Sequence, residues 1–238
     1  MTMKNSIEFK VRGRYALFTD PLTRVGGEKS TYHIPTYEAL KGVVKSIYWK
    51  PTIIWVVDAV RVMKRFRTET KGVKPMDYGG GNSLAYYTYL SDVEYQVRAH
   101  FEWNEHQAGL KDDRIDGKHH SIARRMMERG GRQDIFLGTR ECQSYVEPCT
   151  FGEGTGEYDG YGNLDFGLTF HGFDYPDETG KDELRKRFWR PKMEDGVITF
   201  PRPEECQVNE FVRKMTAKEF KVGKNMEHVD MTAAETGL

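Results

Sequence analysis

The sequence predicts an α+β domain built around an antiparallel sheet. Three observations support this fold class: several segments alternate like strands, two segments repeat like helices, and the two types follow one another in a defined order. The clearest alternation runs from Tyr87 to Trp103, with apolar side chains on one side and polar ones, Asp92 and Gln96 among them, on the other. This segment is expected to form a long antiparallel strand with one covered face.

A strand and a helix are predicted within the first 50 residues. Ile7, Phe9 and Val11 alternate with charged residues, as expected for a strand. A long loop is expected at 18–33, and Pro35 then suits the first turn of a helix. Apolar residues follow at helical spacing, and the helix is expected to stop before the proline at position 51.

The next elements are predicted between residues 53 and 137. The β-branched run 53–62 predicts a second strand, and the glycines at 79–81 predict a linker before the long strand. Ser121 is expected to cap a second helix that buries Ile122 and Met126. A short strand is expected at 135–137.

The order strand, helix, strand, strand, helix, strand is that of the ferredoxin-like fold, which RNA-recognition domains share. We therefore expect a ferredoxin-like domain at 1–143. A small β-rich extension is expected at 144–215, with strands at 164–173 and 197–200. Residues 216–238 contain few strong apolar positions and are expected to form a flexible tail.

Composition places the chain among water-soluble proteins. The 238 residues are 38% hydrophobic and 30% charged, and the mean hydropathy is −0.70. The sequence has no apolar run of about 18 residues and no secretory signal at its start, so we expect no membrane association and a cytoplasmic location. Its three cysteines lack paired spacing, which argues against a disulfide framework or a thiolate zinc site.

The net charge of zero hides two halves of opposite sign. Residues 1–143 carry 24 basic and 17 acidic side chains, and 144–238 carry 12 and 19. Basic blocks of this kind suit a phosphate-bearing partner such as RNA, although each residue could equally be a solvated surface charge. The candidate RNA contacts are Arg12, Arg14, Arg61, Lys64, Arg65, Arg67, Arg124 and Arg125.

Two glycine-rich stretches do not form nucleotide-binding motifs. In the stretch 26–31, Glu28 occupies the place of the glycine that a phosphate-binding loop needs before its lysine. The stretch 152–156 has no preceding strand and lacks the final glycine of a dinucleotide fingerprint. The aromatic signature of common RNA-recognition strands is also missing.

Lys118 and His119 carry the chemistry that the sequence indicates most clearly. A lysine can stabilise an anionic phosphorane, and a histidine can transfer protons near neutral pH. These are the functions that metal-free RNA cleavage requires. Two alternatives remain at this point: His119 and His120 are exposed residues at a helix start, or they join the acidic turn 112–116 in a metal site.

Five ordered segments resemble one protein family. They are FKVRGRYALFTDP, PTYEALKGVVKSIYWKPTIIW, TYLSDVEYQVRAHFEW, GKHHSIARRMMERGG and FLGTREC, which span residues 9–142. Together they resemble the Cas-five proteins of the type I-C (Dvulg) CRISPR system, members of the RAMP superfamily. The resemblance covers about residues 1–148 and extends more loosely to about 200.

The resemblance implies a ferredoxin-like RAMP domain with a β-rich extension. It also implies an endoribonuclease that cuts the repeat of precursor CRISPR RNA without a metal ion or cofactor. The family's catalytic tyrosine, lysine and histidine match Tyr48, Lys118 and His119. Tyr48 and His119 would share the proton transfers and Lys118 would stabilise the phosphorane, with the identity of the base and the role of His120 left open.

The resemblance further implies RNA and protein partners. The protein would bind the repeat hairpin, remain on the 5′ handle of its product, and join the backbone and large subunits of the type I-C Cascade complex. Relatives in other CRISPR subtypes keep the fold without cleaving RNA. A non-catalytic, RNA-binding structural subunit is therefore the alternative function.

Overall fold

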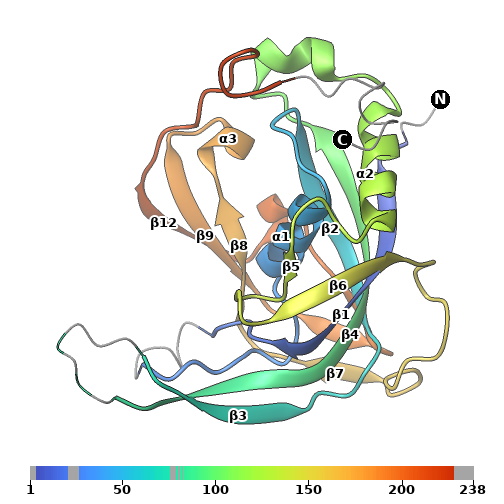
Figure 1. Cartoon of the computed structure of the whole chain (residues 1–238), viewed down its shortest axis with the longest axis vertical. Coiled ribbons are helices and arrows are strands. Elements are labelled where there is room, and N and C mark those ends of the chain that lie inside the picture. Colours follow the sequence, from blue (N-terminus) through green and yellow to red (C-terminus); the bar gives the residue numbers. More distant parts are fainter. Residues whose placement is uncertain (1–3, 21–26, 76–78, 80, 82, 228–238) are drawn as a thin grey trace.

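The computed structural model describes residues 4–20, 27–75, 79, 81 and 83–227. Parts of the loop predicted at 18–33, of the linker predicted at 79–81 and of the tail predicted at 216–238 lie outside these residues. Figure 1 shows the elements, which are β1 Ser6–Ala16, α1 Tyr37–Ile47, β2 Ile53–Val62, β3 Thr68–Val73, β4 Ala85–Trp103, a 3-10 helix Ala108–Asp113, α2 Lys118–Glu128, β5 Ile135–Phe136, β6 Gln143–Pro148, β7 Asn163–Asp165, β8 Thr169–Asp174, α3 Pro176–Thr179, β9 Glu183–Trp189, β10 Lys192–Glu194, β11 Val197–Thr199, a 3-10 helix Pro203–Glu205 and β12 Val208–Lys214.

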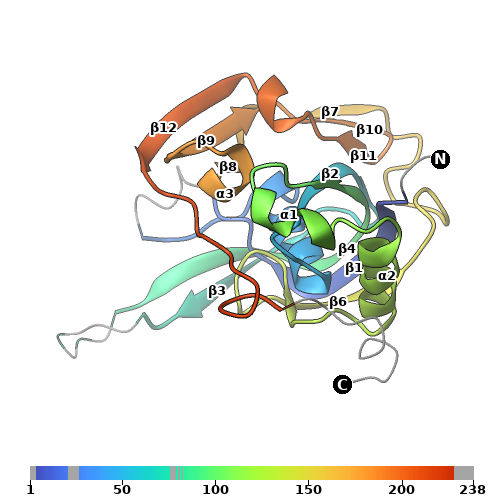
Figure 2. The ribbon, with the colours of Figure 1, turned by 90° about the horizontal axis from the view of Figure 1, so that it is seen from above.

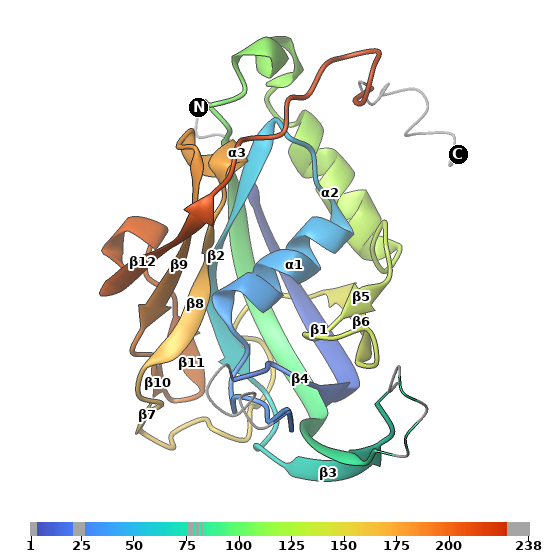
Figure 3. The same cartoon turned by 90° about the vertical axis from the view of Figure 1, so that its left-hand side faces the viewer.

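The main sheet of the described chain has nine strands, all paired antiparallel. Its central order is β6-β1-β4-β2, with β5 beyond β6 and β3 paired to the first part of β4. Helices α1 and α2 pack on the same face of these strands (Figure 3). An antiparallel sheet with few helices is thus confirmed.

Residues after 143 extend this sheet and also form a second one. Strand β11 pairs with β2, and β10 and β7 continue the sheet beyond it. Strands β8, β9 and β12 form a separate three-stranded sheet, which lies on the other side of α1 from α2 (Figure 2). The single strand predicted at 164–173 is wrong, because Gly167 turns the chain with φ 68° and separates β7 from β8.

Both helix starts differ from the predicted ones. The hydroxyl of Thr36 accepts a hydrogen bond from the backbone N–H of Ala39 at 3.2 Å, so Thr36 caps α1 and Pro35 lies before the helix. Helix α2 begins directly after Gly117, whose φ of 74° turns the chain into the helix. Ser121 therefore lies inside α2, and Lys118 and His119 occupy its first turn.

The side of β4 that was expected to face solvent is partly covered. Gln96 is only 3% exposed, because its amide donates to the backbone carbonyl of Glu153 at 2.6 Å and accepts from the N–H of Gly152 at 2.8 Å. The loop that follows β6 thus covers the face of the sheet opposite the helices. No helix in the described part of the chain is long and apolar enough to cross a membrane.

Candidate active site

Three side chains named from the sequence meet where α1, β2 and α2 come together. Tyr48 directly follows α1 and is held by a hydrogen bond of 2.7 Å from the indole N–H of Trp55 to its backbone carbonyl. Lys118 and His119 are the first two residues of α2. The turn between α1 and β2 therefore brings a tyrosine to the start of a helix that lies 70 residues later in the chain.

The hydroxyl of Tyr48 and the ring of His119 share a direct hydrogen bond. The Tyr48 oxygen lies 2.8 Å from Nδ1 of His119, and Nε2 of His119 lies 2.8 Å from the backbone carbonyl oxygen of Asp113. A carbonyl only accepts, so Nε2 carries the proton. Nδ1 of the neutral ring is consequently the acceptor, and the hydroxyl of Tyr48 donates to it.

Asp113 holds the remaining parts of this cluster in place. Its carboxylate accepts from the ammonium of Lys118 at 2.8 Å and from the hydroxyl of Thr52 at 2.6 Å. The residue is 2% exposed, so the Lys118–Asp113 ion pair is strongly shielded from water. Asp113 thus orients Lys118 through its side chain and His119 through its backbone.

The geometry gives no support to the alternative of a metal site in the acidic turn. The carboxylate of Asp113 is engaged by Lys118 and Thr52. Among the residues that the structure describes, no three His, Cys, Asp or Glu side chains converge on a common point.

Burial sets the protonation states of the Tyr48–His119 pair. Tyr48 is 1% exposed and His119 is fully buried. Burial, with a further contribution from Asp113, raises the pKa of the Tyr48 hydroxyl well above its usual range, whereas burial lowers the pKa of His119. Near neutral pH the pair therefore consists of a protonated tyrosine and an uncharged imidazole whose Nδ1 accepts the hydrogen bond of the tyrosine.

His120 lies apart from this cluster. Its Nε2 lies 3.0 Å from the backbone carbonyl of Ser6 in β1, and the side chain is half-buried at the helix surface. His119, rather than His120, is the histidine that contacts Tyr48.

The structure does not bring the predicted arginines and lysines of β1 and β2 to the cluster. Strand β2 begins beside Tyr48 and ends at Val62, about 30 Å away at ~3.3 Å per residue. Residues Arg65 and Arg67 follow that far end and are exposed. Arg12, Arg14 and Lys64 line a shallow groove there, in which Lys64 is paired to Asp92 at 2.6 Å. Figure 1 shows this end next to β3.

Arg61 has a structural environment. It is 6% exposed, and its guanidinium donates to the carboxylate of Asp159 at 2.7 Å and to the backbone carbonyls of Glu153 and Gly154. These contacts tie the loop after β6 to the sheet and leave Arg61 turned away from solvent. On α2, Arg124 is exposed and Arg125 half-buried.

Two cations that the sequence did not single out lie next to the cluster. Lys50 follows Tyr48 by two residues, and its charge acts on His119. The backbone N–H of Arg132 donates to the last carbonyls of α1, at Ser46 and Ile47, and this holds Arg132 near the cluster. Its charge consequently acts on both Tyr48 and Lys50. The sequence contains one signal that Arg132 lies near the end of α1. The glycines at 130 and 131 end α2, and their φ values of 86° and 109° turn the chain toward α1.

One protein family and two named relatives are similar to most of this chain. A family described as CRISPR-associated protein (Cas_Cas5) matches residues 6–201. The CRISPR pre-crRNA endoribonuclease Cas5d of Mannheimia succiniciproducens is 27% identical over 232 residues, covering 84% of this chain and 96% of the relative. The protein of the same name from Thermus thermophilus is 29% identical over 195 residues, covering 78% and 80%.

Two solved structures are similar along most of their length. A crystal structure of a CRISPR-associated protein has a TM-score of 0.75 and 37% sequence identity, covering 88% of this chain and 98% of the other. A functionally uncharacterized protein from Streptococcus mutans has a TM-score of 0.73 and 38% identity, covering 88% and 99%.

Proposed function

The chain belongs to the Cas5 family of CRISPR-associated proteins, and on this premise we propose that it is an endoribonuclease that cuts precursor CRISPR RNA within the repeat. The observation that carries the proposal is the hydrogen bond of 2.8 Å between Tyr48 and His119, with Lys118 beside it. The names of two relatives, both pre-crRNA endoribonucleases, agree with this activity.

The proposed reaction is an internal transfer at the RNA backbone. The ribose 2′-oxygen attacks the neighbouring phosphorus, a new P–O2′ bond forms, and the bond to the 5′-oxygen breaks. The proton of the 2′-hydroxyl passes to the Tyr48–His119 pair, and the pair returns a proton to the leaving 5′-oxygen. The products carry a 2′,3′-cyclic phosphate and a 5′-hydroxyl, and neither water nor a metal ion is consumed.

The pair acts as one unit in this proposal, because a single hydrogen bond joins its two members. Neutral Nδ1 of His119 is the final proton acceptor, and the hydroxyl of Tyr48 relays the proton between substrate and imidazole. Lys118 stabilises the negative charge that develops on the phosphorane. Asp113 is a positioning residue, since it holds Lys118 and His119 without touching substrate.

RNA needs an opening movement to reach these groups, since Tyr48, Lys118 and His119 are 1%, 7% and 0% exposed. Lys50 lies next to the cluster and donates to the backbone carbonyl of Glu227 at 2.9 Å. This hydrogen bond is exposed to solvent, so water can replace it at little cost. We propose that RNA displaces this contact when it enters.

We also propose that the domain predicted at 1–143 has the ferredoxin-like RAMP fold. The central order β6-β1-β4-β2, with two helices on one face, supports this fold, and because β6 is its edge strand we place the end of the domain at Pro148 instead of residue 143. The rest of the chain to residue 215 would be the β-rich extension. Residues 220–227 of the predicted tail 216–238 pack against the end of α1, and 228–238 lie outside the described residues. A protein that processes CRISPR RNA would act in the cytoplasm.

The cations at the far end of the sheet could bind the RNA product and so keep it on the protein after cleavage. We propose that Arg12, Arg14, Lys64, Arg65 and Arg67 contact RNA backbone, as do Arg124 and Arg125 on α2, and that buried Arg61 does not. The protein would stay on the 5′ handle and join the backbone and large subunits of the type I-C Cascade complex. The alternative is a subunit that binds RNA without cutting it.

Cleavage of the system's repeat RNA by the purified protein in excess EDTA tests the activity, with His119→Ala as the matched variant. One cut with cyclic phosphate and 5′-hydroxyl ends, lost in His119→Ala and with a 2′-deoxyribose at the cut site, supports the mechanism. Binding without cleavage, with or without magnesium, supports the non-catalytic alternative.

A further inference from the structure

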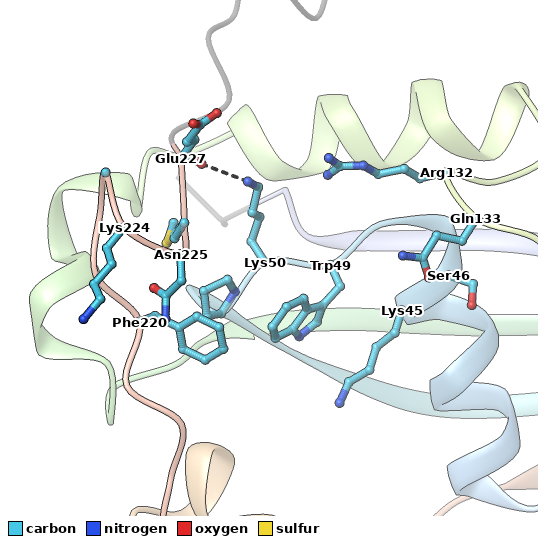
Figure 4. Close-up of a pocket in the computed structure, with 13 residues that line it drawn as sticks. Lys45, Ser46, Trp49, Lys50, Arg132, Gln133, Phe220, Lys224, Asn225 and Glu227 are labelled. Carbon is cyan, nitrogen blue, oxygen red and sulfur yellow. Dashed lines mark hydrogen bonds between the residues drawn. The ribbon is translucent and has the colours of Figure 1, made fainter.

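A cavity of about 850 Å³ lies between the end of α1 and the segment 220–227. Four cationic side chains and one carboxylate are among the residues that line it, together with Trp49 and Phe220 (Figure 4). The volume is in the range of binding sites for small molecules, about 300 to 1,000 Å³. The cationic lining points to an anionic occupant.

Three of these cations, Lys50, Arg132 and Lys224, form no ion pair with a carboxylate of the described chain, whereas Lys45 is bound to Glu178 at 2.8 Å. Burial and the nearby charge of Arg132 lower the pKa of Lys50, so the two cations repel each other. Figure 4 shows both side chains on the side of the cavity next to α2, and Lys45 pointing away from them. An anion between Lys50 and Arg132 would remove this repulsion.

The same cavity offers an aromatic surface. The rings of Trp49 and Phe220 meet edge to face with centroids 5.8 Å apart, and Trp49 is half-buried. Proteins that bind unpaired nucleotides combine cations for the phosphate with aromatic rings on which the base stacks. The cavity contains both components.

Its position connects the cavity to the reaction. Trp49 and Lys50 are the two residues that follow Tyr48, and the charges of Lys50, Lys118 and Asp113 act on one another across the cluster. Tyr48, Lys118 and His119 do not line the cavity, so a nucleotide bound there would lie next to the cluster and would reach the Tyr48 hydroxyl through the opening movement proposed above.

We propose that this cavity binds the unpaired nucleotide next to the cleaved bond, with its base on Trp49 and its phosphate between Lys50 and Arg132. The inference rests on the proposed function and adds a substrate subsite to it. Trp49, Lys50 and Arg132 then select for single-stranded RNA at the cut, while the cations at the far end of the sheet hold the rest of the repeat.

Binding and cleavage of the repeat RNA are measured for Trp49→Ala and Arg132→Gln. The control is Lys192→Gln, which removes one exposed positive charge from β10 in the extension. Loss of a stacked base weakens RNA binding by roughly 5- to 150-fold. We expect a loss of this size for Trp49→Ala, a smaller one for Arg132→Gln, and wild-type values for the control. Wild-type Kd and KM for both cavity variants overturn the inference and leave the cleavage activity intact.

Tryptophan fluorescence tests the subsite without cleavage. In a His119→Ala background, repeat RNA that stacks on Trp49 quenches part of the emission of the four tryptophans. The further change Trp49→Phe, which keeps an aromatic ring, removes this quenching but keeps most of the binding. Unchanged quenching overturns the inference. If RNA quenches the fluorescence of the wild-type protein but the protein does not cleave the RNA, the subsite is supported and the proposed activity is overturned.

Discussion

Two histidines in the described part of the chain are fully buried, and their surroundings are very different. His119 lies between the hydroxyl of Tyr48 and the backbone carbonyl of Asp113, next to the Lys118–Asp113 ion pair. His171, in β8, stacks on Tyr37 with ring centroids 4.2 Å apart and accepts a hydrogen bond from Arg187. Burial lowers the pKa of both, and for His171 burial and the charge of Arg187 lower the pKa to about 3.

The difference shows that burial alone does not prepare a histidine for proton transfer. A guanidinium keeps its protons at every relevant pH, so Arg187 fixes His171 as a neutral acceptor that cannot take up a proton. A tyrosine hydroxyl can pass its proton on, so His119 has a partner with which to exchange one. The neighbouring residues, rather than the degree of burial, distinguish a reactive site from a structural one.

Exchanging both histidines for phenylalanine gives the largest contrast. His119→Phe removes the proton acceptor, and loss of general acid-base catalysis lowers the rate by about 10²- to 10⁴-fold. His171→Phe keeps a ring to stack on Tyr37 and leaves the rate constant unchanged. Single-turnover cleavage of repeat RNA measures both, and circular dichroism checks that both fold. Equal losses in the two variants would contradict the distinction.

Two buried lysines, Lys118 on α2 and Lys41 on α1, allow the same comparison between a reactive and a structural residue. Lys118→Met removes the charge that stabilises the phosphorane and is expected to lower kcat by about 10²- to 10³-fold, with little change in KM. Lys41→Met removes a lysine that is 2% exposed and bound to Glu178, which retains Lys45. We expect lower thermal stability for Lys41→Met and unchanged cleavage kinetics. A large loss of kcat in Lys41→Met would mean that the cleavage assay reports stability.

Asp113→Asn tests the positioning of Lys118. Breaking one side of a buried ion pair costs about 3 to 5 kcal/mol of unfolding free energy. Denaturant unfolding is expected to show this loss, and kcat is expected to fall because Lys118 is no longer held. The double variant Asp113→Asn/Lys118→Met restores stability without restoring cleavage. Recovery of cleavage in the double variant would rule out a role for Lys118 in the reaction.

The two histidines also differ in how they affect the pH dependence of stability and of cleavage. These are the smallest of the expected effects near neutral pH. Both folded-state pKa values lie below the ordinary value of about 6.5, so the unfolded chain binds more protons and stability falls as the pH drops below about 6.5. Cleavage needs neutral His119 and is expected to vary little between pH 7 and 8, with an acid limb below pH 6.5. His171→Phe reduces the acid loss of stability and leaves this acid limb in place, as pH-rate profiles and thermal melts would show.

Local sequence predicted an element well where the element's own residue pattern was enough to define it. Strand β2 has the predicted bounds 53–62, and the hydroxyl of Tyr48 lies 2.8 Å from Nδ1 of His119. The catalytic roles that the family resemblance implies for Tyr48, Lys118 and His119 stay predictions. The role of Arg61 was missed because the loop that buries it lies about 90 residues later in the chain. Asp113 was considered only as a metal ligand, since sequence spacing does not reveal that its carboxylate meets Thr52 and Lys118.

The pairing of β2 with β11 has a consequence for synthesis of the protein. One edge of β2 acquires its neighbour only when residues 197–199 emerge, about 135 residues after the end of β2. At ~5 to ~20 residues per second the ribosome needs roughly seven to thirty seconds for that stretch. During this time the nascent chain exposes an apolar strand edge that can pair with other chains. Translation that stops before residue 197 would leave this edge open permanently, and aggregation and proteolysis would then remove the fragment.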